Sequence, residues 1–264
     1  MKISHKNKYD KLQTLLMCYP VNYDVTKKTV NFNLMFQQYN NFINLLTKEG
    51  VDLYFLDPIY GVNQVYTRDI AFVIDDILFI SKMTNEARQE EHKSIEEYIK
   101  DKDLHSYKMK NNIEGGDVIV YNQYVLVGMS KRTSLKAVEE LQEYLNKSGK
   151  EYKVIQIKFD CDVMLHLDCV LNIINKDSCI ASNFIYDKDK IENIFKNYYY
   201  IDNRTSLELG TNIICLGKNK VISGNKQVCK LLEDKGVTTF YINYSEIIKG
   251  GGAFTCTTLP IYRK

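Results

Sequence analysis

The feature that most restricts the fold of this 264-residue chain is a repeat of short apolar segments. Each segment follows an acidic, amide or cysteine residue, and these five residues are Asp69, Asp117, Asp168, Asn212 and Cys256. The intervals between them are 48, 51, 44 and 44 residues. A period of roughly 20–50 residues is typical of solenoids and propellers. The spacing therefore predicts five related structural units.

The second unit shows the expected order of elements most clearly. After Asp117 come two apolar runs separated by a turn, within residues 118–128, which is typical of a hairpin. Apolar residues then recur every three or four positions between residues 135 and 145, as on one face of a helix. Residues 152–157 complete the unit as a strand. Residues 212–242 repeat this order, so each unit is predicted to be strand, strand, helix, strand.

The fifth unit begins at Cys256, so close to the last residue that its helix and final strand must come from elsewhere in the chain. Residues 32–46 carry a helical apolar stripe, and residues 51–56 resemble a strand. A ring closed by both terminal segments protects the edges of its sheets. No linker rich in Pro, Gly or Ser divides the chain. We therefore predict an α/β protein, a five-bladed α/β propeller, with residues 1–264 as one domain.

The composition restricts the kinds of ligand that the protein is expected to bind and the cellular compartment in which it is expected to occur. The net charge is +2 with interspersed signs, so the chain lacks the charge distribution expected for binding nucleic acid or an anionic membrane. The apolar run at residues 70–80 contains two aspartates and is too short to cross a bilayer, and residues 1–11 lack the apolar stretch of a secretory signal. The seven cysteines form no Cys-x-x-Cys pair. We expect a cytoplasmic protein with a small or peptide-sized ligand.

The starts of the five units carry chemically active side chains. Equivalent positions in a ring lie at equal distances from its axis, so these starts are expected to face one central channel. The candidates are Asp69, Glu114, Asp117, His166, Asp168 and Cys256. A cysteine is reactive as a thiolate, and a nearby histidine can lower its pKa and act as a general acid and base. Several carboxylates in one desolvated channel favour a cationic ligand, and a planar guanidinium fits paired carboxylates best.

Five motifs at these positions resemble the guanidino-group-modifying enzymes, which include arginine deiminase, dimethylarginine dimethylaminohydrolase, agmatine deiminase and the amidinotransferases. The motifs are Tyr66-Thr-Arg-Asp69, Glu114-Gly-Gly-Asp117, Gly128-Met-Ser-Lys-Arg132-Thr, His166-Leu-Asp168 and Gly250-Gly-Gly-Ala-Phe-Thr-Cys256, in the order of the family. The fold of that family is a five-bladed α/β propeller, in agreement with the repeat. We expect no cofactor and no metal.

The resemblance implies a Cys-His mechanism with a covalent intermediate. Cys256 would attack the guanidinium carbon and form an S-alkylthiouronium as an amine leaves. His166 would protonate that amine and then activate water for the second step. Glu114 would hold the guanidinium and help to orient His166.

The resemblance also implies a set of substrate-binding residues. Asp69 and Asp168 would clamp the guanidinium nitrogens, and Asp117 belongs to the same set. Arg132 and Arg88 resemble the ligands of the substrate α-carboxylate, for which arginine suits bidentate pairing.

The substrate within the family is inferred from two features. A dimethylated nitrogen has no N–H to donate, so a second carboxylate clamp at Asp168 favours an unmethylated guanidinium. The glycines at 250–252 also resemble those of the deiminases. We therefore expect arginine to be converted to citrulline and ammonia. The alternatives are dimethylarginine hydrolysis, amidino transfer and a non-enzymatic binding module of the same fold, and a homodimer is left open.

A zinc site is a competing interpretation of one segment. Cys161, Asp162, His166 and Cys169 could be drawn as its ligands. An alternating strand through residues 163–168 would direct both cysteines away from His166, so a zinc site is not expected.

Overall fold

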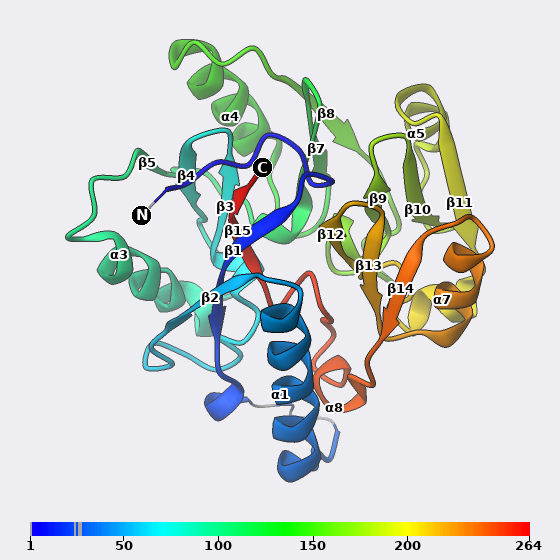
Figure 1. The fold of residues 1–264 in the computed structure, drawn as a ribbon. Helices are drawn as coiled ribbons and strands as arrows, with labels where there is room; N and C mark the ends of the chain where they lie inside the picture. The colour runs from blue at the N-terminus through cyan, green and yellow to red at the C-terminus, as the bar shows by residue number, and fades with distance from the viewer. Residues whose placement is uncertain (1, 24, 26–27) are drawn as a thin grey trace.

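The structure, a computed structural model, describes residues 2–23, 25 and 28–264. Within these residues it contains five three-stranded sheets arranged in a ring (Figure 1). Each sheet is one blade, and most helices lie on the outside of the ring. The predicted five-bladed α/β propeller is confirmed.

Four blades follow one another along the chain. Their strands are β3 (Ala71–Ile74), β4 (Ile77–Ile80) and β5 (Ser106–Lys108); β6 (Val118–Tyr121), β7 (Tyr124–Gly128) and β8 (Lys153–Ile157); β9 (Leu171–Asn175), β10 (Ser178–Ser182) and β11 (Asn197–Ile201); β12 (Ile214–Gly217), β13 (Lys220–Ser223) and β14 (Thr238–Tyr241). In each blade the first two strands are antiparallel and the second and third are parallel. A parallel pair needs a crossover, which explains the predicted order of strand, strand, helix, strand.

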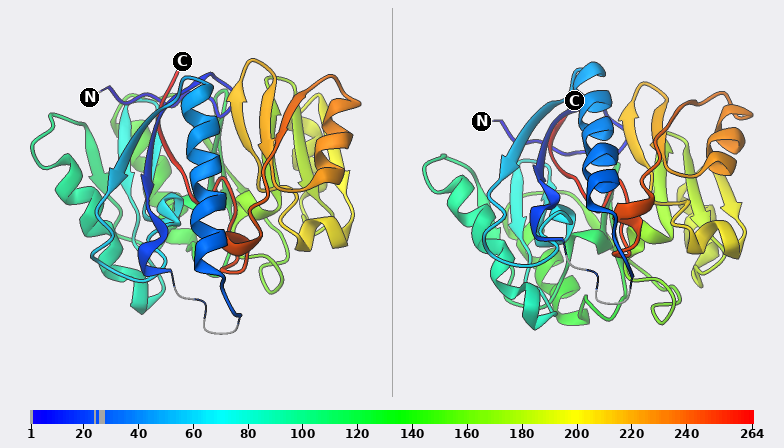
Figure 2. Two further views of the ribbon diagram at one scale, coloured as in Figure 1. Left: turned by 60° about the horizontal axis from the view of Figure 1, so that its bottom comes forward. Right: turned by 90° about the horizontal axis from the view of Figure 1, so that it is seen from below.

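The fifth blade combines both ends of the chain. It consists of β15 (Leu259–Arg263), β1 (Leu12–Cys18) and β2 (Asp52–Leu56), with β1 in the middle. Strand β1 was not predicted from the sequence, although most of its residues are apolar and buried. The two termini consequently lie near each other on one face of the ring (Figures 1 and 2).

The longer helices are the crossovers of the blades. They are α1 (Phe32–Lys48), α3 (Lys93–Ile99), α4 (Leu135–Lys147), α5 (Lys188–Ile194) and α7 (Lys226–Glu233). The apolar stripes predicted for α1 and α4 are largely buried, except for Phe32 and Leu135 at the first positions of the two helices, which are exposed. Among the described residues, no helix combines the length and the apolar character required to cross a bilayer.

Short helical segments occupy the remaining connections. They are η1 (Pro20–Asn22), α2 (Thr67–Ile70), η2 (Glu86–His92), η3 (Gly115–Asp117), η4 (Leu167–Cys169), α6 (Asn203–Leu207) and α8 (Ser245–Ile248). Three of them, α2, η3 and η4, lie at or just before the first strand of a blade and contact one another. Because they contain or adjoin the motif residues, this contact brings the motifs together at the centre of the ring.

Candidate active site

A cavity of about 140 Å³ opens where the motif segments meet. Its lining residues are Asn63, Tyr66, Asp69, Asn85, Arg88, Arg132, Leu165, His166, Gly250, Gly251, Gly252 and Cys256. Two larger hollows, of about 430 and 480 Å³, are lined by none of the motif residues. We take the smaller cavity as the candidate site because its walls carry the reactive groups.

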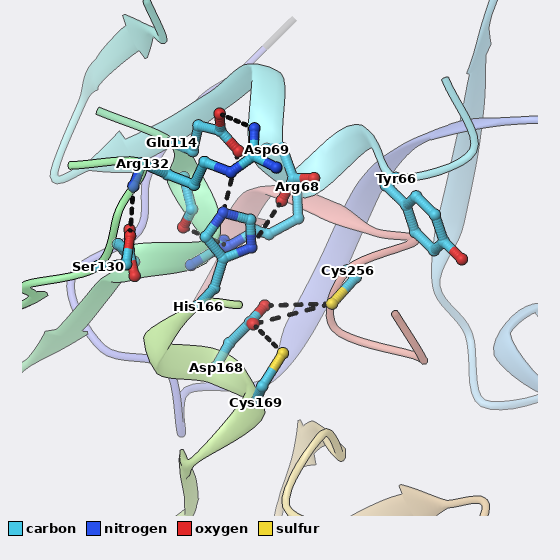
Figure 3. A network of polar contacts seen from close by, with 12 residues as sticks. Tyr66, Arg68, Asp69, Glu114, Ser130, Arg132, His166, Asp168, Cys169 and Cys256 are labelled. Atoms are coloured by element: carbon cyan, nitrogen blue, oxygen red, sulfur yellow. Dashed lines mark hydrogen bonds and ion pairs between the residues drawn. The ribbon is translucent and has the colours of Figure 1, made fainter. Parts of the chain in front are cut away.

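His166 lies between two carboxylates (Figure 3). Its Nε2 is 2.9 Å from Glu114 Oε2, and its Nδ1 is 3.6 Å from Asp69 Oδ1. Burial alone lowers the pKa of His166, but the charge of Asp69 and the hydrogen bond to Glu114 outweigh it and raise the pKa well above its usual value. Despite its own burial, Glu114 has a lowered pKa because it accepts the bond from His166. The imidazole is therefore held in its charged form.

Cys256 follows the glycine-rich loop and presents its sulfur to Asp168 (Figure 3). The sulfur lies 3.6 Å from Asp168 Oδ2, and Asn212 Nδ2 donates a hydrogen bond to it at 3.2 Å. Asn212 also accepts a bond from the backbone of Thr255 at 3.0 Å, so its amide orientation follows from its partners. One donor and one carboxylate thus hold the thiol from two sides.

Asp168 is fully buried behind Cys256 and is not part of the cavity wall. Cys169 Sγ lies 3.5 Å from its carboxylate, which therefore contacts two thiols. Burial raises the pKa of Asp168, and His166 and Lys8 oppose that shift. Asp168, which was predicted to clamp a guanidinium, therefore lies next to Cys256, the residue predicted to attack the guanidinium carbon.

Arg88 is engaged by acidic side chains of the protein itself. Its Nη1 donates to Asp69 Oδ2 at 2.6 Å, and its Nη2 donates to Glu91 Oε2 at 2.8 Å. The side chain lines the cavity but is largely buried. The predicted role as a free ligand for a substrate carboxylate does not match this geometry, because the pairing with Asp69 uses the guanidinium to fix that carboxylate.

Arg132 remains the more available cation of the site. Its side chain is 24% exposed, and its Nη1 is 3.7 Å from Glu114 Oε1. Among the described residues, the one ion pair of this guanidinium is the long contact with Glu114, and the side chain lines the cavity.

Asp117 does not line the cavity, contrary to its predicted place among the substrate-binding residues. Its carboxylate accepts hydrogen bonds from Ser130 at 2.5 Å, Thr133 at 2.6 Å and the backbone of Leu167 at 2.9 Å. Burial raises its pKa to about 6. These bonds join η3, η4 and the loop after β7, so Asp117 positions the segment that carries His166.

The paired glycines before Asp117 permit the close packing at the centre of the site. A Cβ on Gly116 would lie 2.8 Å from both Cγ and Nδ1 of His166. A Cβ on Gly115 would clash with the backbone oxygen of Arg68. The motif needs glycine at both positions because no side chain fits there. Gly252 is similarly confined, because its Cβ would lie 2.6 Å from the Tyr66 ring.

Two groups of side chains have donor atoms within 4.8 Å of one another and could hold a cation, considering the described residues only. They are Asp69, Glu114 and His166, and Asp168, Cys169 and Cys256. In the first group a metal would compete with the neighbouring arginines for the carboxylates. The zinc alternative fails because neither group contains Cys161 or Asp162.

The strand expected at residues 163–168 is wrong. This segment forms turns and then η4. As a result Cys169 is not directed away from the site but lies beside Cys256, as the shared contacts with Asp168 indicate.

Several residues of the site were not assigned a role from the sequence, among them Asn212, Glu91 and the lining residues Asn63, Tyr66, Asn85 and Leu165. Asn212 was identified only as the start of the fourth unit, and its position in the repeat is the signal that could have suggested a place at the centre. Glu91 is fully buried against Arg88, and its spacing of three residues from that arginine on a helical segment was its only signal.

Comparison with known sequences identifies the family. The family model described as arginine deiminase matches residues 25–206 and 196–263. The uncharacterized protein YkgA of Bacillus subtilis is 33% identical over 98% of this chain and 94% of its own length. The arginine deiminase of Lentilactobacillus hilgardii is 27% identical over 80% of this chain and 62% of its own length. The chain thus spans less than two thirds of that enzyme.

Comparison with solved structures supports the same fold. The amidinotransferase SxtG of Microseira wollei superimposes with a TM-score of 0.85 at 17% identity, covering 99% of this chain and 97% of the other. The N-terminal domain of ArgZ, a cyanobacterial arginine dihydrolase, gives 0.85 at 16% identity, over 96% and 98%. The chain therefore belongs to the arginine deiminase family, within the superfamily of guanidino-group-modifying enzymes.

Proposed function

We propose that this protein hydrolyses a C–N bond of a guanidino substrate, with Cys256 as nucleophile and arginine as the substrate that yields citrulline and ammonia. The observation that carries the proposal is the position of His166 between the carboxylates of Glu114 and Asp69, in the wall of a cavity that Cys256 also lines. A general acid, a nucleophile and carboxylates for a cationic ligand are thereby present in one buried site.

The first half of the proposed reaction forms a covalent intermediate. The thiolate of Cys256 adds to the guanidinium carbon and gives a tetrahedral adduct. As the adduct collapses, a C=N double bond forms again and the bond to the departing nitrogen breaks. His166 donates a proton to the departing nitrogen, so ammonia leaves and an S-alkylthiouronium remains. The loss of that proton leaves the imidazole neutral.

In the second half, the neutral His166 accepts a proton from water as the water adds to the same carbon. As this second adduct collapses, its hydroxyl proton passes to solvent, the C=O bond forms and the thiolate is expelled, which gives citrulline. The released ammonia takes up that proton, so the sum is the arginine cation and water converted to citrulline and ammonium. Glu114 supports both steps because its hydrogen bond to Nε2 stabilises the imidazolium before and after the exchange.

The surrounding charges support arginine as substrate. Asp69 lines the cavity, and Asp168 lies behind the sulfur, so carboxylates are available near a guanidinium whose carbon approaches Cys256. Arg132 is the side chain suited to a substrate carboxylate, since Arg88 is occupied by Asp69 and Glu91.

The experiment measures citrulline and ammonia released from arginine and, separately, from asymmetric dimethylarginine. Wild type is compared with Cys256→Ser and with the matched control Cys161→Ser, which changes a thiol outside the cavity. We expect citrulline from arginine in wild type and control and none in Cys256→Ser. A strong preference for dimethylarginine contradicts the proposed substrate, and folded protein that turns over neither compound contradicts hydrolysis of both.

A further inference from the structure

A second group of charged side chains is buried inside the ring and does not line the cavity. It consists of His5, Lys8, Arg68 and Arg263, which we call the basic cluster. Each of these residues is at most 2% exposed. Three of them carry a positive charge at neutral pH in water. Arg68 belongs to the motif Tyr66-Thr-Arg-Asp69, but no role was assigned to it, and the proposed reaction uses none of the four side chains.

Strand β6 joins two members of the basic cluster. The guanidinium of Arg68 donates from Nη2 to the carbonyl of Val118 at 2.6 Å, and the backbone N–H of Lys8 donates to the carbonyl of Val120 at 3.0 Å. Lys8 belongs to the N-terminal segment, which crosses the face of the ring near its centre (Figure 1). That segment therefore brings Lys8 to the same strand that Arg68 reaches from α2.

The C-terminal strand brings the other two members to the same place. Arg263 donates from Nη1 to the carbonyl of Asp10 at 2.8 Å and to that of Cys215 at 2.9 Å. Its backbone N–H donates to the carbonyl of Ser4 at 2.7 Å, directly beside His5. Burial, together with the nearby Arg263, Arg68 and Lys8, lowers the pKa of His5 well below its usual value.

The basic cluster has buried nitrogen atoms that have no hydrogen-bond partner among the described residues. They are Nζ of Lys8, Nη1 of Arg68, Nε and Nη2 of Arg263, and both ring nitrogens of His5. Buried polar groups in proteins nearly always have a partner, and an unpaired buried charge is costly. Four side chains with the same deficit at one place point to a shared acceptor.

The nearest carboxylates do not fill that role. Asp168 Oδ2 and Oδ1 contact the sulfurs of Cys256 and Cys169, and Asp69 Oδ2 is paired with Arg88. Within the described part of the chain, no ion pair joins an acidic side chain to Lys8, Arg68 or Arg263. Burial, reinforced by Arg68, lowers the pKa of Lys8 to about 7 despite the opposing charge of Asp168.

We propose that the basic cluster binds a small inorganic anion of the halide class, chloride in solution, between Lys8, Arg68 and Arg263. A halide accepts hydrogen bonds from any direction, so it suits N–H donors that arrive from three separate segments. It would neutralise buried positive charge and join the N-terminal segment, α2 and β15. This inference does not depend on the proposed reaction, and its readouts are binding and stability.

Bromide replaces chloride in such sites and can be located by anomalous scattering. Crystals of the wild-type protein grown with sodium bromide are expected to show an anomalous peak among the nitrogen atoms of the basic cluster. In parallel, the thermal unfolding temperature is measured in sodium chloride and in sodium gluconate at equal ionic strength. We expect it to be roughly 2–4 °C higher in chloride, because a ligand of the folded state stabilises it.

Lys8→Met tests whether the effect belongs to this cluster. The variant is expected to lose both the bromide peak and the difference between chloride and gluconate. Lys6→Met is the matched control, since Lys6 lies in the same segment with a side chain that is 64% exposed. It should keep both signals.

No bromide peak in the wild-type protein would overturn the proposal and leave water as the occupant, whether or not Lys8→Met folds. A peak that persists unchanged in Lys8→Met would also overturn it.

Discussion

Two buried histidines in the same ring have opposite pKa shifts. His166 and His5 are each 1% exposed, so burial penalises their charged forms alike. The pKa of His166 is nevertheless raised by Asp69 and Glu114, whereas that of His5 is lowered further by Arg263, Arg68 and Lys8. The comparison teaches that the neighbouring charges, rather than the degree of burial, decide which of the two imidazoles is positively charged.

The same contrast separates the candidate active site from the basic cluster as a whole. In the site, the carboxylates of Glu114 and Asp69 face His166 and arginines. In the basic cluster, cations face one another and carry unpartnered nitrogens. In the first arrangement Asp69 Oδ1 is buried without a hydrogen-bond partner, which suits a cationic ligand, whereas the unpartnered nitrogens of the second suit an anion.

The largest effect is expected from removing the negative charge of Glu114, which is hydrogen-bonded to His166. Glu114→Gln keeps the shape of the side chain and removes the carboxylate that holds the imidazolium. We expect kcat for the proposed hydrolysis to fall by about 10²–10⁴-fold, the usual worth of general acid–base catalysis. The pKa of His166 should fall, so the rate that depends on its protonated form should be lost at a lower pH than in wild type. A pH–rate profile measures both changes.

Glu140→Gln is the matched control, because Glu140 accepts bonds from Lys110 and Asn111 on the surface of α4, outside the cavity. It should retain the wild-type profile. An unaltered profile in Glu114→Gln would contradict the role of Glu114 in the comparison.

Crowding the same histidine should have the next largest effect. Gly116→Ala adds a methyl group 2.8 Å from the His166 ring and 3.1 Å from Asp69 Oδ1, so one of them must shift. We expect a loss of about 2–3 kcal/mol in the free energy of unfolding, together with reduced turnover. Chemical denaturation and steady-state kinetics measure the two.

Gly224→Ala is a milder control, since the nearest atom, Phe254 Cε2, would be 3.2 Å away. If the two variants lose the same stability and neither loses turnover, His166 is not held as tightly as the comparison requires.

A substitution of Asn212, which donates a hydrogen bond to the Cys256 sulfur, is expected to have a smaller effect. Asn212→Asp keeps the acceptor for Thr255 and replaces the donor to Cys256 by a charged oxygen. A negative charge beside the sulfur disfavours the thiolate. We expect kcat to fall by about 10–100-fold and the limb of the pH–rate profile that reports the thiolate to move to higher pH.

Asn172→Asp makes the same substitution at a buried asparagine that contacts Thr255 rather than the sulfur. Equal loss of activity in both variants would show that the effect arises from burying a carboxylate and not from the thiol.

The blades were largely predictable because each is a local pattern. The residue interval between unit starts follows from the length of one blade. The crossover helix α4 lies where the apolar spacing predicted it, and α7 lies within residues 212–242, where the repeated order of elements predicted a helix. The strand β1 was missed because its role as the middle strand depends on closing the ring.

The partners of individual charges were less predictable. Arg88 and Asp117 were both expected to bind the substrate, yet the first pairs with Glu91 and the second does not line the cavity. In the basic cluster only Arg68 belongs to a motif, and nothing in the sequence indicated its partners. His5 and Lys8 lie in a polar segment without periodicity, and they are buried only because that segment crosses the ring. Such contacts depend on tertiary packing, which a repeat does not encode.

The smallest expected effect tests the other histidine. Because the folded state resists protonating His5, the unfolded state binds more protons below pH 6.5, the ordinary pKa of histidine. Stability from this residue is therefore present above that pH and lost as the pH falls. His166 has the opposite sign: its contribution is full below pH 6.5 and is lost as the pH rises through its raised pKa.

His5→Gln should accordingly flatten the acid side of the stability profile. One histidine that stays neutral costs about 1 kcal/mol between pH 6.5 and about 5.5, and the variant should not show this loss. Denaturant unfolding at both pH values measures the difference, with exposed His105→Gln as control.

Nuclear magnetic resonance titration should find His166 charged and His5 neutral at neutral pH. If His5 instead titrates near its ordinary pKa, the positive charges of the basic cluster are already neutralised. The contrast between the basic cluster and the candidate active site then disappears.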